Sequence, residues 1–157
     1  METVLRPVAR RDVQTLALIM TQAIATRNGS AYCGINPDFL AFIREALNRP
    51  KGWSRVACLD GQIVGFAIGA PMLDVAVSKS EELMFLMTLP EYWGRGIGSE
   101  LLKAAARICR TRRARYVKLH AQKSNRRALD LYARHGYVVI DSADITNDPL
   151  LTLQLKL

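Results

Sequence analysis

Residues 89–99 are Leu-Pro-Glu-Tyr-Trp-Gly-Arg-Gly-Ile-Gly-Ser, a run with three glycines at alternate positions. The apolar segment before it (83–89) predicts a buried strand, and the pattern after it (98–113) predicts a helix. Glycines let the backbone approach a bulky anion, and the free N–H groups at a helix start bind phosphate oxygens. The run therefore predicts a pyrophosphate site, although such turns also serve tight packing alone. It matches neither the dinucleotide-binding fingerprint nor the Walker A pattern.

A second block, Ser124–Tyr137, predicts a helix followed by a strand. Asn125 and Tyr132 are seven positions apart, which is two helical turns, so both side chains can lie on one face. Arg126 and Arg127 fall in the first turn, where the helix dipole disfavours cations unless an anion is near. The alternative interpretation is a core tyrosine and two solvated arginines.

Basic residues concentrate in the segment that holds both blocks. The chain has a formal charge of +8, and residues 93–135 contain twelve basic and two acidic residues, which gives this segment +10. The remaining residues therefore sum to −2. An anionic partner is expected at this segment: a phosphorylated cofactor, a nucleic acid or an acidic protein.

The order of the other patterns predicts the topology. Asp60-Gly61 between two β-rich runs predicts a hairpin, and Asp12 and Asn36 are expected to cap the first two helices. Strands are predicted at about 3–8, 53–59, 62–70, 83–89, 116–121, 137–140 and 151–157; the two capped helices and those at 98–113 and 124–135 complete the order β-α-α-β-β-β-α-β-α-β-β. Strand, helix, strand over 83–121 implies one parallel crossover in a largely antiparallel sheet.

Length and composition favour one soluble domain over residues 1–157. The chain is 50% hydrophobic and 23% charged, with no long apolar stretch and no signal-like N-terminus, so we expect a cytoplasmic protein without a membrane partner. Cys33, Cys58 and Cys109 lack disulfide or zinc-site spacing, and we expect three buried thiols and no metal site.

Together the two blocks resemble the GNAT superfamily of N-acetyltransferases, over about Val4 to Leu157. The family's acyl-CoA signature, Arg/Gln-x-x-Gly-x-Gly/Ala, corresponds to Trp93–Gly98. Its Asn-x-x-Ala-x-x-x-Tyr-x-x-x-Gly-Tyr/Phe block corresponds to Asn125–Tyr137. Trp93 stands where the family usually has arginine or glutamine, a difference that removes one polar side chain and no backbone donor.

The resemblance implies an α/β (α+β) fold: a mixed, mostly antiparallel seven-stranded sheet, about four flanking helices and a splayed parallel strand pair at the centre. It also implies acetyl-CoA as the acyl donor, with the pantetheine arm between the splayed strands. The residues expected to hold acetyl-CoA are Leu86, Met87, Thr88, Leu89, Arg95, Gly96, Ile97, Gly98, Ser99, Asn125, Arg126 and Arg127.

Acetyl transfer to an amine needs three events. The amine must lose a proton, the oxyanion must be stabilised, and the leaving thiolate must be protonated. By resemblance Tyr132 is the general acid, and Asn125 is grouped with the catalytic residues. Glu82, at the start of the central strand, is the candidate base; Glu81, His120 and a water chain remain alternatives. His135, at the end of its helix, is expected to interact with the helix dipole.

The resemblance predicts an N-acetyltransferase that acts on a primary amine of a small molecule, an amino acid or a peptide N-terminus. Two alternatives stay open: a non-catalytic acyl-CoA-binding domain, and an enzyme acting on aminoacyl-tRNA through the basic cluster Arg110, Arg112, Arg113 and Arg115. Arginines in the last turn of a helix are also commonly solvated. A homodimer is a further open possibility.

The resemblance also implies that the acceptor binds beside residues 24–47 and the loop over 72–80. These segments contain few carboxylates, namely Asp38, Glu45 and Asp74, with Glu81 and Glu82 just beyond. A polycation such as a polyamine would need a cluster of carboxylates. A monoamine, an amino acid or a peptide N-terminus is therefore favoured.

Overall fold

A computed structural model describes residues 2–31, 33–72, 79–144 and 147–157. Within these ranges seven strands form one mixed sheet in the order β1-β2-β3-β4-β5-β7-β6. The strands are β1 (Val4–Arg6), β2 (Trp53–Leu59), β3 (Gln62–Pro71), β4 (Ser80–Thr88), β5 (Tyr116–Gln122), β6 (Val138–Ala143) and β7 (Leu150–Lys156). The predicted fold class and element order are confirmed.

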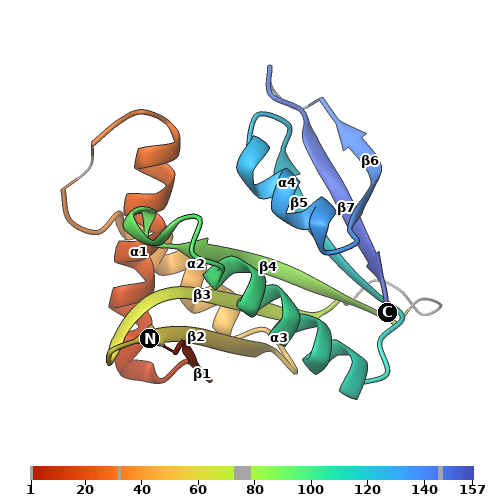
Figure 1. Cartoon of the computed structure of the whole chain (residues 1–157), viewed down its shortest axis with the longest axis horizontal. Helices are drawn as coiled ribbons and strands as arrows, with labels where there is room; N and C mark the ends of the chain where they lie inside the picture. The colour runs from red at the N-terminus through yellow and green to blue at the C-terminus, as the bar shows by residue number, and fades with distance from the viewer. Residues whose placement is uncertain (1, 32, 73–78, 145–146) are drawn as a thin grey trace.

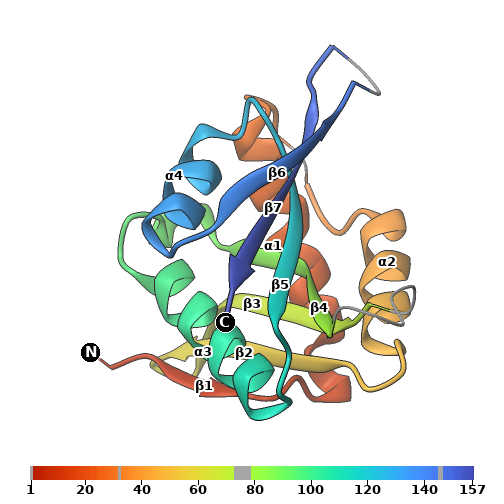
Figure 2. The same ribbon diagram turned by 90° about the vertical axis from the view of Figure 1, so that its right-hand side faces the viewer.

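Helices cover both faces of the sheet (Figure 2). One face carries α1 (Val13–Arg27) and α2 (Pro37–Leu47), and the other carries α3 (Ile97–Thr111) and α4 (Arg126–Arg134). Each pair of helices encloses its own apolar core, with the fully buried Phe66 in the first and the fully buried Leu101 in the second. Burial of side chains of this size stabilises the fold by about 1.5–3 kcal/mol each.

Several local predictions are confirmed by the backbone. Asp60 and Gly61 have φ values of 51° and 79°, the left-handed pair that a tight hairpin turn requires. The side chain of Asn36 accepts a hydrogen bond from the Asp38 amide at 3.0 Å and caps α2. Local turn and cap chemistry is therefore sufficient to place these boundaries.

Asp12 precedes α1 as predicted, but its carboxylate does not cap the helix. It instead accepts from the Ala9 amide and from Arg6, both at 2.7 Å, and a short 3₁₀ turn (Arg10–Asp12) leads into α1. The Arg6 guanidinium holds the pKa of this buried carboxyl below its usual value. Asp12 thus ties β1 to the start of α1.

Two further expectations are corrected. β4 begins at Ser80 and not at 83, because Glu81 and Glu82 interrupt the apolar pattern without ending the strand. The thiols were expected to be buried, but Cys33 is exposed and Cys58 is half-buried, while Cys109 is buried. None of the described helices is both long and apolar enough to cross a membrane.

The feature that positions the site is the divergence of β4 from β5. The two strands pair in parallel only from Ser80–Glu82 to Tyr116–Lys118, and beyond these residues they separate (Figure 1). The register between β3 and β4 also shifts next to Met84, which bends β4 at this point. The sheet therefore opens at its centre, as the family resemblance implies.

Candidate active site

A cleft follows the opening between β4 and β5. Its inner part, of about 290 Å³, lies between the two strands and is bordered by α1 and α4. Its outer part, of about 340 Å³, lies between the glycine-rich run and α4. Leu86, Thr88, Trp93, Arg127 and Tyr132 line both parts. The two parts therefore share walls and form one continuous site.

The outer part contains the start of α3. Gly96 has a φ of 84°, and its carbonyl accepts the first helical hydrogen bond, from the Glu100 amide. The amides of Ile97, Gly98 and Ser99 consequently have no partner within the helix, and these residues line the cleft. Together with the positive end of the helix dipole, such amides can bind phosphate oxygens.

Tyr132 projects from α4 into the region shared by both parts of the cleft. Its ring is 7% exposed and lies 5.8 Å from the ring of Tyr137. Burial raises the pKa of Tyr132 to about 12, with the charge of Arg27 opposing the shift. The phenol is therefore protonated at neutral pH and can donate a proton.

Trp93 has a defined role in the structure. Its Nε1 donates to the Thr88 carbonyl at 3.0 Å, which fastens the glycine-rich run to the end of β4. The guanidinium of Arg127 lies 3.2 Å from the centre of its indole ring, and burial lowers the pKa of this arginine. The pair connects the two walls of the cleft. This contact between α4 and the run could not be anticipated from local sequence.

Some of the other predicted residues line the cleft and some do not. Asn125 lines the inner part, and its side chain makes no cap hydrogen bond to α4. Met87 also lines the inner part. Leu89 is buried, and its amide donates to the Val64 carbonyl. Arg95 lies over the ring of Tyr92 and, like the exposed Arg126, is outside the cleft lining.

His135 contacts the start of α3. Its Nε2 lies 3.0 Å from the Ser99 hydroxyl, and burial is the main cause that lowers its pKa. A neutral imidazole interacts only weakly with a helix dipole, so the expected dipole role is replaced by a hydrogen bond that joins α4 to α3. The Ser99 hydroxyl is correspondingly occupied.

The candidate bases occupy different surroundings. Glu82 is the last residue of β4 that pairs with β5, and its carboxylate is 3.9 Å from Arg49 Nη1. Glu81 is 3% exposed and pairs with Arg112 at 3.0 Å on the α3 side. His120 is exposed, lines the inner cleft and contacts the Thr152 hydroxyl. The base assignment stays a prediction. Tyr32, Asp74 and the rest of the loop over 73–78 lie outside the described residues.

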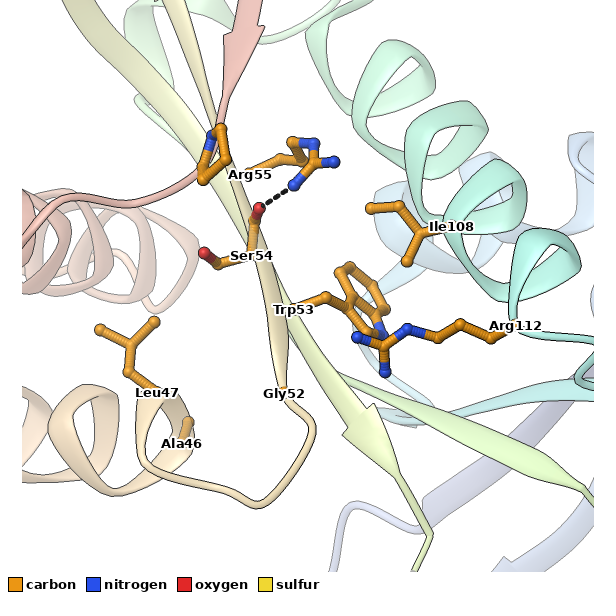
Figure 3. Close-up of a pocket in the computed structure, with 9 residues that line it drawn as sticks. Ala46, Leu47, Gly52, Trp53, Ser54, Arg55, Ile108 and Arg112 are labelled. Carbon is orange, nitrogen blue, oxygen red and sulfur yellow. Dashed lines mark hydrogen bonds between the residues drawn. The ribbon is translucent and has the colours of Figure 1, made fainter.

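A separate cavity of about 340 Å³ lies between the start of β2 and the end of α3, and Figure 3 shows Arg112 reaching back toward Trp53 there. Arg112 also donates to the Lys51 carbonyl and to Glu81. The sequence leaves Arg112 either in a tRNA-binding cluster or solvated, and in the structure it pairs with the buried carboxylate of Glu81. Gly52 lines this cavity, but neither the glycine-rich run nor the start of α3 is part of its lining.

We expect Arg112→Leu to destabilise the fold by about 3 kcal/mol at pH 7, because Glu81 would be left buried and unpaired. Burial already raises the pKa of Glu81, and Arg112 opposes that shift. Without Arg112 the pKa rises further, so the stability deficit should shrink as the pH falls and Glu81 takes up a proton. Urea unfolding at several pH values measures the free energy of unfolding of each variant.

The matched control is Arg110→Leu, at an exposed residue, whose stability should stay within about 0.5 kcal/mol of wild type. Equal stability of the two variants would contradict the pairing of Arg112 with Glu81.

Comparison with known proteins shows the family to which the chain is related. The profile described as the Acetyltransferase (GNAT) family matches residues 22–137. The chain belongs to the GNAT family of acetyltransferases. Members of this GNAT family are acyltransferases that use acetyl-CoA as the acyl donor, which agrees with the resemblance seen in the sequence.

Individual relatives match parts of the chain. An uncharacterized N-acetyltransferase of Archaeoglobus fulgidus is 32% identical over 98 residues, which are 61% of this chain and 67% of that protein. A thialysine N-ε-acetyltransferase of Sus scrofa is 28% identical over 103 residues, 66% of this chain and 58% of that protein. The chain thus matches about two-thirds of the length of the first relative and a smaller share of the second.

Solved structures support the GNAT fold over the whole chain. The PaiA N-acetyltransferase of Thermoplasma acidophilum, solved in complex with coenzyme A, superposes with a TM-score of 0.75 at 19% identity and covers 100% of both chains. At this identity the likeness shows the fold, and the assignment of individual site residues rests on the geometry of the cleft.

Proposed function

We propose that this protein transfers an acetyl group from acetyl-CoA to a primary amine by direct attack of the amine on the thioester. The observation that carries the proposal is the cleft itself. One end holds helix-start amides that have no partner within α3, and the same walls hold a buried Tyr132 whose raised pKa keeps it protonated. A site for an anion and a proton donor are thereby combined in one continuous space.

The residues present fit acetyl-CoA. The amides of Ile97, Gly98 and Ser99 would hold the pyrophosphate, with Arg127 and Arg134 as the cations that line the same outer part. Among the residues that the structure describes, β4 has no strand partner on the β5 side beyond Glu82, so its edge can hydrogen-bond the amides of the pantetheine arm. When bound, acetyl-CoA supplies the acetyl group as an activated thioester.

The chain's own residues would position the reactants and move protons. Tyr132 Oη would donate its proton to the departing sulfur, because burial keeps the phenol protonated. Asn125 lines the inner part without capping α4, and its side chain would orient groups there. Glu82, on the α2 side of β4, would accept a proton from the incoming amine directly or through water.

Glu82→Gln tests the base. If Glu82 accepts the proton, we expect kcat/KM to fall by about 10- to 100-fold and the acidic limb of its pH profile to change, because the carboxylate is no longer present. Initial rates between pH 5 and 10 measure this. Glu2→Gln, at an exposed position before β1, is the control. An unaltered pH profile of kcat/KM for Glu82→Gln would assign deprotonation of the amine to water.

The acceptor is an amine of a small molecule, an amino acid or a peptide N-terminus. The aminoacyl-tRNA alternative drew on the basic cluster at the end of α3, and one of its members, Arg112, is engaged with Glu81. Salt-dependent binding of tRNA would favour that alternative. A homodimer stays a prediction.

Two measurements on the wild-type protein test the proposed function. Calorimetry with CoA and acetyl-CoA should show micromolar or tighter binding, and thiol release with panels of amines, amino acids and peptides should show turnover. Binding without turnover on any panel would favour the non-catalytic alternative. Absence of CoA binding would overturn the assignment of the cleft.

A further inference from the structure

Arg27 is a cation that the cofactor does not account for. It is the last residue of α1, and its Nη2 donates to Gln122 Oε1 at the end of β5, at 3.3 Å. It lines the inner part of the cleft and not the outer part. This hydrogen bond connects the end of α1 to the end of β5, and it holds the guanidinium against the inner part of the cleft.

The other arginines of the cleft line its phosphate end. Arg127 and Arg134 project from α4, on the opposite face of the sheet from α1 (Figure 2), and both line the outer part. Arg127 also lines the inner part, and its guanidinium lies over the Trp93 ring. Phosphates bound at the start of α3 would be neutralised by these two residues. Arg27 lines the inner part together with Tyr132, and its charge opposes the rise of the Tyr132 pKa. In the proposed reaction the acceptor amine would enter this inner part.

No carboxylate lines the cleft among the residues that the structure describes. Two acidic residues border this region, and each has its own partners. Glu82 faces Arg49 at 3.9 Å, and Asp148 accepts hydrogen bonds from the amide and the hydroxyl of Ser124. The charge of Arg27 is therefore uncompensated by the described part of the chain.

We propose that the acceptor is an amino acid whose free carboxylate is bound by Arg27 while its amine faces the thioester near Tyr132. This inference rests on the proposed acetyl transfer and narrows its substrate class. A guanidinium binds a carboxylate through two parallel hydrogen bonds, which fixes the orientation of a small ligand. A polyamine, in contrast, would bring further positive charge toward Arg27 without a carboxylate to offset it.

Matched acceptor pairs test the role of the carboxylate. Thiol release is measured for each amino acid and for its amide, at a pH where both amines are largely unprotonated, and for spermidine. We expect the wild-type kcat/KM to be at least about 10-fold higher for the best amino acid than for its amide, because the amide lacks the charge that Arg27 binds.

Variants assign that preference to Arg27. Arg27→Gln should raise KM for the amino acid by about 10- to 100-fold, and should leave both the rate with the amide and the Kd for CoA within about 3-fold. Arg27→Lys should retain part of the preference. Arg10→Gln, an exposed arginine at the opposite end of α1, is the control and should behave as wild type.

The outcomes separate this inference from the proposed function. If the protein binds CoA and acetylates amides or spermidine as well as amino acids, or if Arg27→Gln leaves the preference intact, the amino-acid assignment is overturned and acetyl transfer stands. If calorimetry shows no CoA binding by the wild type, both assignments fall together.

Discussion

Gly96→Val is expected to weaken CoA binding by about 10- to 100-fold. Gly96 has a φ of 84°, and a β-branched residue in this left-handed region costs about 1–3 kcal/mol. The exposed loop would relax to another conformation in the free variant, and binding would have to reverse that change. The amides of Ile97, Gly98 and Ser99 would also lose their common direction. Calorimetry with CoA and acetyl-CoA measures the loss.

Gly61→Val is the matched control. Gly61 has a φ of 79° and, like Gly96, open space where a Cβ would lie, but it belongs to the β2–β3 hairpin. Both variants should lose stability in thermal unfolding, and only Gly96→Val should lose affinity. A folded Gly96→Val protein with the wild-type Kd would remove the start of α3 from the binding site.

Gly98 shows how the two glycines differ. Its φ is outside the left-handed region, and an added Cβ would instead meet the end of the Leu131 side chain at 2.9 Å. The sequence predicts a glycine requirement at both positions, but the physical cause is backbone conformation at Gly96 and packing of α3 against α4 at Gly98. Only tertiary structure separates these causes.

The sequence alone predicted the features that depend on residues close to one another along the chain. The Asp60-Gly61 turn and the Asn36 cap each involve residues within a few positions, so local chemistry is sufficient to predict them. Contacts between residues far apart in the sequence could not be predicted in this way. Arg112 meets Glu81 across 31 positions, and nothing in the helical pattern of α3 distinguishes it from the exposed Arg110.

In the candidate active site, too, local motifs were predicted and contacts between distant residues were not. Motif spacing predicted the glycine-rich run and the helix that carries Tyr132, and the structure brings them to one cleft. Trp93 was expected to contribute only its backbone, because its side chain departs from the usual residue. The stack with Arg127 requires α4 to fold over the run, and this geometry follows from the packing of two helices on one face of the sheet.

Tyr132→Phe is expected to lower kcat by about 10- to 1,000-fold, the scale of general acid catalysis, with the Kd for CoA changed by less than a few-fold. The ring keeps its packing, and only the proton donor is lost. Burial raises the pKa of Tyr132 to about 12, so the phenol stays protonated throughout the range from pH 6 to 9.5. The ratio of wild-type to variant kcat should therefore be constant across that range.

Tyr137→Phe is the control for this experiment. The Tyr137 ring packs against Tyr132, and its buried hydroxyl has no hydrogen-bond partner among the described residues. Removing that hydroxyl leaves no partner unsatisfied, so stability and kcat should both be retained. If Tyr132→Phe instead turns over at the wild-type rate and loses only about 1 kcal/mol of stability, Tyr132 is a core residue and another group protonates the thiolate. A ratio of rates that falls toward 1 at high pH would also contradict the assignment, because it would mean that the phenol ionises within the working range.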